Sequence, residues 1–325
     1  MDLLSRLREG IVLCAEGYVF ELERRGYIQA PEFIPEAVLD NPDAVKQLHK
    51  DFAFAGSDVM VALTYYSDRK NLSLINRQDQ LEQFNRQALK IAKSVALDNN
   101  LLLAGNIGDT HIYNPNNHNE TSNLIRSIYT EQAKIAKEEG ANFIIAETLD
   151  YLGEALVALE VIKSMDMRAV ITFGSHFGKI GTSDGYTFPN ACKILEANGA
   201  DVVGLNCVMG PQTMLPVLRQ IRETIKGYMA ALPVPYNTTD HEHSFMGLKR
   251  RDGKPAFPAN MDSLLLDRGD MADFAIEAKN AGVNYLGICC GSGPHHVRAM
   301  AEALGRQVPG SRYSPLPYRL QNKAV

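Results

Sequence analysis

Three of the chain's five cysteines stand where short apolar segments end. Cys289 and Cys290 are adjacent in "NYLGICCGSGP", and Cys207 closes "DVVGLNC". Three thiolates that converge on one point form a good zinc site, and three protein ligands leave a coordination position for water or substrate. Because a thiol bound to Zn²⁺ loses its proton, this ligand set predicts alkyl transfer to a metal-bound thiolate.

Adjacent cysteines can share one metal ion only where the chain leaves regular strand geometry, because successive strand residues point to opposite faces. The glycine, serine and proline that follow Cys290 permit such a departure. The two other cysteines have a different explanation. Cys14 lies inside an apolar segment and Cys192 inside a helical pattern, so both are predicted to fill space in the core.

Eight short apolar segments alternate with segments of helical spacing. They are rich in aliphatic and β-branched residues and apolar on both faces, as buried parallel strands are. They begin at Ile11, Asp58, Leu101, Asn142, Arg168, Asp201, Tyr228 and Asn284. Several of the helical segments stop at a glycine, namely Gly140, Gly199 and Gly282. This alternation predicts an α/β protein, a single-domain (β/α)₈ TIM-type barrel.

A doubly wound open sheet is the alternative fold. Such a sheet usually shows a glycine-rich fingerprint after its first strand, and "CAEGYVFE" stands there instead. In a barrel, active sites gather at the C-terminal ends of the strands. The predicted strand ends are unusually polar and reactive, and they include Glu16-Gly17, Thr64-Tyr65-Tyr66, Asn106, Glu147, Cys207, Tyr236-Asn237 and Cys289-Cys290.

Composition narrows the possible partners of this 325-residue chain. It is 45% hydrophobic with a formal charge of -5, and its pI near 5.9 without a basic run argues against nucleic acid as a partner. No apolar stretch approaches the roughly 18 to 20 residues that a membrane helix needs. The first ten residues lack the apolar segment of a secretion signal, so a cytoplasmic protein is predicted. An odd number of cysteines favours thiols or metal ligands over disulfides.

The motifs resemble a known family. "GLNC" and "GICCG" are similar to the zinc motifs of the homocysteine S-methyltransferase family, and "GYVFELERRGYIQA" and "IIAETLDYLGEA" resemble its betaine-dependent members. The resemblance runs from about Ile11 to Leu304. It implies a homocysteine-binding (β/α)₈ barrel over residues 1–310 with a short C-terminal tail, 311–325. It also implies zinc as cofactor and methyl transfer from an onium donor to homocysteine, which gives methionine.

The resemblance also assigns roles to single residues. Cys207, Cys289 and Cys290 fall on the zinc ligands, and Glu147 falls on the carboxylate that holds the homocysteine amino group. These four are the predicted catalytic residues. The other predicted substrate-binding residues are Glu16, Gly17, Phe33, Thr64, Tyr65, Tyr66 and Thr148, of which the three aromatic ones fall near the methyl donor. Aromatic rings suit a quaternary ammonium or sulfonium group through cation–π attraction.

The sequence departs from the family at three places. The family's Asp-Gly-Gly is Ala15-Glu16-Gly17 here, an aromatic position is Thr148, and the chain contains no tryptophan. Betaine is the predicted donor, with dimethylsulfoniopropionate or S-methylmethionine as alternatives. Two other readings stay open, a non-catalytic barrel that binds an onium compound or amino acid and a barrel enzyme with another chemistry. The sequence stops soon after the predicted barrel, without the long C-terminal arm of the animal enzymes, so their tetramer is not carried over to this chain, and homo-oligomerisation stays open.

Overall fold

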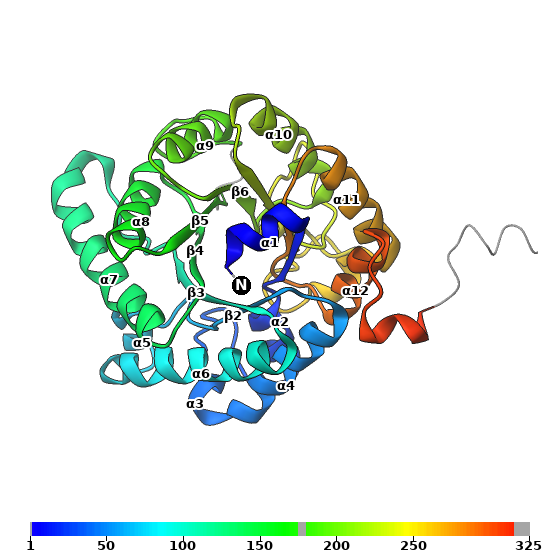
Figure 1. Ribbon diagram of the computed structural model, residues 1–325, viewed down its shortest axis with the longest axis horizontal. Coiled ribbons are helices and arrows are strands. Elements are labelled where there is room, and N and C mark those ends of the chain that lie inside the picture. The colour runs from blue at the N-terminus through cyan, green and yellow to red at the C-terminus, as the bar shows by residue number, and fades with distance from the viewer. Residues whose placement is uncertain (1, 175–179, 315–325) are drawn as a thin grey trace, which may run out of the picture.

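Eight parallel strands close into a barrel in chain order, with helices around the outside (Figure 1). The computed structural model describes residues 2–174 and 180–314. The strands are β1 Val12–Ala15, β2 Val59–Val61, β3 Leu102–Gly108, β4 Phe143–Leu149, β5 Arg168–Phe173, β6 Val202–Asn206, β7 Tyr228–Leu232 and β8 Tyr285–Ile288. Pairing of β1 with β8 closes the cylinder, which confirms the predicted barrel and excludes the open sheet.

The helices cover the barrel because each presents an apolar stripe to the strands. They are α1 Leu3–Glu9, α2 Tyr18–Arg24, α3 Ala37–Asp40, α4 Pro42–Ala55, α5 Arg69–Ser73, α6 Leu81–Asn99, α7 His118–Glu138, α8 Leu152–Ser164, α9 Phe188–Ala197, α10 Pro211–Thr224, α11 Arg268–Asn280 and α12 Pro294–Ala303. Short 3₁₀ turns are η1 Gln78–Gln80, η2 Pro115–Asn117, η3 Phe245–Gly247, η4 Asp262–Leu264 and η5 Pro309–Tyr313. Within the described chain, no helix is long and apolar enough to span a bilayer.

Glycines end several helices as the sequence predicts. Gly140, Gly199 and Gly282 follow α7, α9 and α11 with φ of 85°, 95° and 83°. This left-handed conformation costs glycine little because it has no Cβ. The chain can therefore turn sharply from each helix into the next strand. Cys14 and Cys192 are fully buried in the core, as expected for cysteines that fill space.

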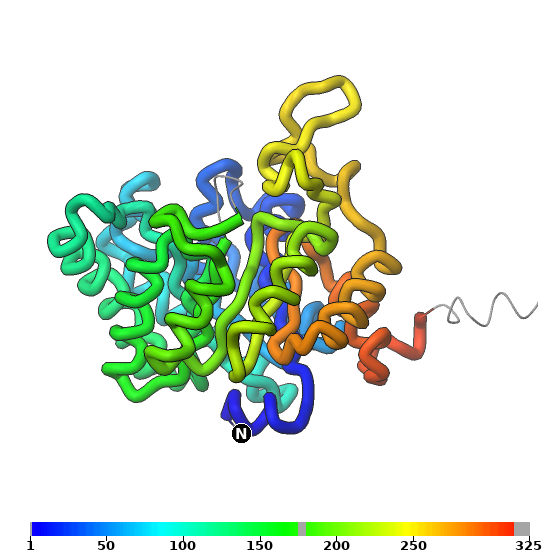
Figure 2. The backbone as a smooth tube through the Cα atoms, turned by 90° about the horizontal axis from the view of Figure 1, so that it is seen from above, coloured from blue at the N-terminus to red at the C-terminus, as the bar shows by residue number. Residues whose placement is uncertain are grey.

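The two ends of the barrel differ. Helix α1 lies across the end at which the strands begin, as both views show (Figures 1 and 2). At the opposite end, the segment between β7 and α11, residues 233–267, projects above the strands (Figure 2). This excursion holds η3 and η4 and stands at the mouth where the strands end. The predicted tail falls largely on residues 315–325, which lie outside the described residues, and η5 packs against α4.

A buried carboxylate ties α8 to the end of β3. Glu154 is fully buried, and its Oε1 accepts from the Thr110 amide at 2.9 Å, the Thr110 hydroxyl at 2.7 Å and the Tyr129 hydroxyl at 2.6 Å. Its Oε2 has no hydrogen-bond partner. Burial, with repulsion from Asp109, raises the pKa of Glu154 to about 7. The protonated form is therefore the one that folding favours.

This shift makes stability depend on pH. Because the folded pKa of Glu154 lies above the unfolded one, its contribution is fully present below the unfolded pKa and is lost as pH rises through about 7. We expect Glu154→Gln, which keeps an oxygen for the three donors, to gain on the order of 3 kcal/mol relative to the parent between pH 5 and pH 8. Chemical denaturation at both pH values measures this difference.

The control is Glu223→Gln, at an exposed position on α10 that changes net charge equally. A difference between Glu154→Gln and the parent that is the same at both pH values would contradict the assignment.

Candidate active site

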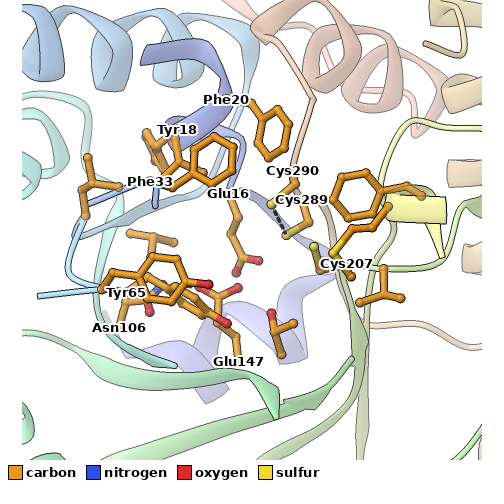
Figure 3. A pocket seen from close by; sticks show the side chains of 18 of the residues that line it. Glu16, Tyr18, Phe20, Phe33, Tyr65, Asn106, Glu147, Cys207, Cys289 and Cys290 are labelled. Atoms are coloured by element: carbon orange, nitrogen blue, oxygen red, sulfur yellow. Dashed lines mark hydrogen bonds between the residues drawn. The ribbon is translucent and has the colours of Figure 1, made fainter. Parts of the chain in front are cut away.

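A cavity opens at the barrel end where the strands finish (Figure 3). Its polar and sulfur-bearing lining consists of Glu16, Asn106, Glu147, Thr148, Cys207, Cys289 and Cys290. Its walls are Tyr18, Val19, Phe20, Phe33, Val61, Ala62, Leu63, Tyr65, Tyr66, Val208, Phe245, Met246 and Phe257. The cavity thus brings together nine of the eleven residues named from the sequence as site candidates, all except Gly17 and Thr64.

The three cysteine sulfurs face one another at one side of the cavity (Figure 3). The Sγ atoms of Cys207, Cys289 and Cys290 all lie within 4.8 Å of one another, and those of Cys289 and Cys290 are 3.9 Å apart. Two ligands of a tetrahedral Zn–S site with bonds near 2.3 Å stand about 3.8 Å apart. The spacing of the Cys289 and Cys290 sulfurs therefore matches a tetrahedral zinc site, and the Cys207 sulfur lies within reach of the same ion.

Both adjacent cysteines can point into this cluster because the strand stops before them. Strand β8 ends at Ile288, and the chain then turns with Ser292 N donating to Cys289 O at 3.2 Å. Gly291 has a φ of 88°, and a Cβ there would stand 2.3 Å from the Tyr236 hydroxyl. A glycine is needed at this turn for both reasons.

The thiols do not ionise easily on their own. Hydrogen bonding to the Cys207 thiol, together with burial, raises the pKa of Cys289 and of Cys290 well above the usual range. Three thiolates this close repel one another strongly in a water-poor cavity. A cation among the sulfurs would relieve that repulsion, as metal binding does when it displaces thiol protons.

Two carboxyl groups lie beside the sulfurs. Glu147 and Glu16 are 5% and 8% exposed, and one oxygen of each lies within 4.8 Å of the Cys289 sulfur and of the other. Glu147 Oε2 accepts from Asn206 Nδ2 at 2.7 Å, and its Oε1 accepts from Asn106 Nδ2. Glu16 reaches this position from the end of β1.

Burial is the largest cause of the altered proton affinity of both carboxyl groups. Burial raises the pKa of Glu147 to about 7, although contacts with Glu16 and Asn106 lower it. Burial and repulsion from Glu147 raise the pKa of Glu16 well above its usual range. Such a pair tends to share one proton near neutral pH. Glu16 Oε2 and Asn106 Oδ1 are buried without a hydrogen-bond partner, so both can accept from a ligand.

Aromatic rings form the other side of the cavity. Four phenyl rings make a closed series of contacts, with centroid distances of 4.9 Å for Phe20–Phe33, 6.4 Å for Phe33–Phe257, 5.7 Å for Phe257–Phe245 and 6.1 Å for Phe245–Phe20. We call these four rings the phenyl ring series. Tyr65 and Tyr66, which follow β2, meet edge to face at 4.5 Å. The cavity is therefore apolar except at the carboxyl and thiol groups and at Asn106 and Thr148.

Gly17 and Thr64 support the site from outside the cavity lining. The Thr64 hydroxyl donates to the carbonyl of Asn106 at 2.6 Å, which ties the ends of β2 and β3 together. A Cβ on Gly17 would stand 2.4 Å from the carbonyl oxygen of Ser292. Glycine there lets the start of α2 approach the turn that follows the cysteine pair.

Several functional positions carry no signal that the sequence reasoning used. Phe20, Phe245 and Phe257 come from α2 and from the long excursion after β7, far apart in the chain. Asn106 stands at a predicted strand end, and Asn206 directly precedes Cys207. A polar amide inside a buried strand is the signal that could have found both asparagines, since such a group needs partners.

The comparisons with known proteins identify the family. A family model described as homocysteine S-methyltransferase matches residues 16–304. The chain belongs to this family. It is 33% identical over 310 residues to the S-methylmethionine–homocysteine S-methyltransferase of Pongo abelii, covering 93% of this chain and 81% of that protein. It is also 33% identical over 325 residues to betaine–homocysteine S-methyltransferase 1 of Xenopus tropicalis, covering 95% of this chain and 78% of that protein.

A solved structure has the same barrel fold as this chain. The metallated form of the homocysteine methyltransferase MmuM from Escherichia coli superposes with a TM-score of 0.71 at 16% sequence identity. The match covers 91% of this chain and 99% of that chain. At this identity the likeness shows the common fold, and the three cysteines, the carboxyl pair and the aromatic walls carry the chemical argument.

Proposed function

We propose that this protein transfers a methyl group from a small onium donor to the thiol of homocysteine and forms methionine. One observation carries the proposal: three thiols at tetrahedral zinc spacing, a carboxyl pair with unpaired acceptors and aromatic walls line a single cavity. Membership of the homocysteine S-methyltransferase family supports the acceptor. The names of its relatives, which include betaine and S-methylmethionine enzymes, support an onium donor.

Cys207, Cys289 and Cys290 would hold zinc. Their sulfurs lie within 4.8 Å of one another, and a sulfur-rich set of three ligands suits a zinc ion that keeps a position for substrate. When bound, zinc lowers the pKa of a coordinated thiol, so that homocysteine is present as the nucleophilic thiolate at neutral pH. The chain's own contribution is the fixed spacing of the sulfurs at the strand ends.

The carboxyl pair would orient the amino acid. A substrate ammonium has three hydrogens, and Glu147, the free Oε2 of Glu16 and the free Oδ1 of Asn106 offer acceptors at one side of the cavity. Hydrogen bonds of this kind to a carboxylate are about twice as strong as neutral ones. The buried pair therefore selects an α-amino acid and places its side-chain sulfur toward the cysteines.

The aromatic walls would hold the donor. Methyl transfer forms a bond between the thiolate sulfur and the methyl carbon, and it breaks the bond from that carbon to the onium nitrogen or sulfur, which leaves as a neutral amine or sulfide with the bonding pair. Charge is neutralised along this path, so a dry pocket does not oppose it. Tyr65, Tyr66 and the phenyl ring series, which includes Phe33, attract the cation and exclude water.

Betaine is the first donor to test. Thr148 replaces an aromatic residue of the betaine-dependent relatives and lines the cavity beside Glu147, so the wall is more open on that side. S-methylmethionine and dimethylsulfoniopropionate are the alternatives, and a panel of the three compounds, assayed for methionine formation, distinguishes them.

The zinc ligands make the first prediction. We expect Cys207→Ala, Cys289→Ala and Cys290→Ala each to lose zinc and turnover while the protein stays folded, because the barrel core does not depend on a catalytic metal. Metal analysis and circular dichroism of the purified variants measure this. The matched control is Cys192→Ala, which removes a buried thiol on α9 away from the cavity. A Cys290→Ala protein with full zinc content and full turnover would remove Cys290 from the site.

Glu147 makes the second prediction. Glu147→Gln keeps the shape of the side chain but removes the charge that pairs with the substrate ammonium. Loss of a charge-assisted hydrogen bond costs about 1.5–3 kcal/mol, so homocysteine should bind roughly 10- to 150-fold more weakly by calorimetry. Glu154→Gln, another buried glutamate but outside the cavity lining, is the control. Equal homocysteine affinity in the parent and in Glu147→Gln would exclude this role.

The donor pocket makes the third prediction. With saturating homocysteine, we expect Phe33→Ala, Tyr65→Ala and Tyr66→Ala to raise the donor KM or lower kcat, by roughly 2- to 30-fold each, because each ring supplies about 0.5–2 kcal/mol of cation–π attraction. Tyr313→Ala removes an exposed tyrosine on η5 and serves as control. If all three pocket variants kept the parent's donor KM and kcat, the donor would have to bind elsewhere.

A further inference from the structure

Asn206 is a fully buried amide at the centre of the site. It is the last residue of β6 and directly precedes Cys207. Its Nδ2 lies 2.7 Å from Glu147 Oε2, 2.8 Å from Thr148 Oγ1 and 3.9 Å from Cys289 Sγ. One side chain therefore faces the carboxylate assigned to the substrate ammonium and a thiol assigned to zinc.

The amide nitrogen of Asn206 has more hydrogen-bond acceptors within reach than it has hydrogens to donate. An amide nitrogen carries two hydrogens, whereas the Nδ2 of Asn206 faces three acceptors. At least two of the three acceptors must therefore share one hydrogen. A stronger hydrogen bond to Glu147 leaves a weaker one for Cys289, and a stronger bond to Cys289 leaves a weaker one for Glu147. The carboxylate and the sulfur compete for one donor group, so a change at either is felt at the other.

The acceptor side of the same amide fixes the backbone. Asn206 Oδ1 accepts from the Thr148 amide and from the Thr172 hydroxyl, both at 2.8 Å. Thr148 has a φ of 58°, which is strained for a β-branched residue, and the pairing of β4 with β5 shifts register between Ala146 and Leu149. The bond from Asn206 holds this strained turn, which comes directly after Glu147.

We propose that Asn206 is a positioning residue that couples the ammonium-binding carboxylate to the zinc-binding thiol set. The inference rests on the proposed function, because it assigns Glu147 to homocysteine and Cys289 to zinc. Asn206 orients Glu147, fixes the turn at Thr148 and donates to the Cys289 sulfur. An N–H donor to a metal-bound thiolate lowers the energy of the sulfur lone pairs, and such outer contacts tune metal affinity.

The experiment compares two asparagines that both donate to Glu147. Asn106 binds Glu147 Oε1 from β3, whereas Asn206 binds Oε2 and also approaches Cys289. We expect Asn206→Ala to weaken zinc binding about 10- to 100-fold in a chelator competition. We also expect it to weaken homocysteine binding. Asn106→Ala should weaken homocysteine binding and leave zinc affinity unchanged.

A spectroscopic measurement covers the case in which Asn206→Ala does not fold. Asn206→Asp keeps an oxygen for Thr148 N and for the Thr172 hydroxyl, so the strained turn is preserved. At pH 8 it removes the N–H donor to Cys289. With cobalt(II) in place of zinc, we expect the thiolate-to-cobalt charge-transfer band to move to lower energy in Asn206→Asp and to stay unmoved in Asn106→Ala.

The outcomes separate this inference from the proposed function. An unmoved cobalt band in Asn206→Asp, or unchanged zinc affinity in a folded Asn206→Ala, would overturn the coupling while the proposed methyl transfer stood. If the parent binds zinc and homocysteine and both Asn206 effects occur, the inference holds even when no donor in the panel supports turnover. Failure of the parent to bind zinc would overturn both.

Discussion

The close packing of acidic groups in a water-poor cavity is the constraint on which the rest of the site depends. Three thiols and two carboxyl groups share one end of the barrel, and burial raises the pKa values of Glu16, Glu147, Cys289 and Cys290. Among residues 2–174 and 180–314, none of the side chains that line the cavity is cationic. Within these described residues, a positive charge in the cavity has to come from a ligand.

The proposed reactants supply that charge in three places. A divalent metal neutralises the sulfurs, the ammonium of an amino acid pairs with the carboxyl groups, and an onium donor brings its charge to the aromatic wall. Each of these three cations would bind at a different part of the cavity. The metal would lie at the thiols, the ammonium at the carboxyl groups and the onium donor at the rings. The site thus favours ligands that carry positive charge, because such ligands can replace the protons that its acidic groups otherwise hold.

The barrel makes this arrangement stable enough to exist. Its continuous core of aliphatic and aromatic side chains extends far beyond the cavity, so the cost of burying acidic groups is offset elsewhere. At the mouth, Thr148 and Cys207 adopt φ of 58° and 54°. Strained residues persist only where their surroundings over-determine them, and the amide of Asn206 between these two positions provides that support.

The sequence predicted the parts of the site that regular structure positions. Strand ends of a parallel barrel meet at one mouth, so Cys207, Glu147 and the cysteine pair could be placed together from spacing alone. The phenyl rings of Phe245 and Phe257 could not be placed from the sequence. They lie in the irregular segment between β7 and α11, where no periodic pattern of hydrophobic residues predicts the course of the chain. The contact of Glu16 with Glu147 also escaped prediction, since it depends on the length of one side chain.

The difference between residues at strand ends and residues on irregular segments also bears on specificity for the methyl donor. Two relatives that are named for different donors, betaine and S-methylmethionine, are each 33% identical to this chain, so overall similarity does not select between donors. The acceptor half of the cavity is built from strand ends, which the barrel holds in register. The wall proposed for the donor is built from rings on α2 and on loops and from Thr148 on a strained turn. Under the proposed assignment, a change of donor needs only a different wall of rings, whereas a change of acceptor would require the strand ends to be rebuilt.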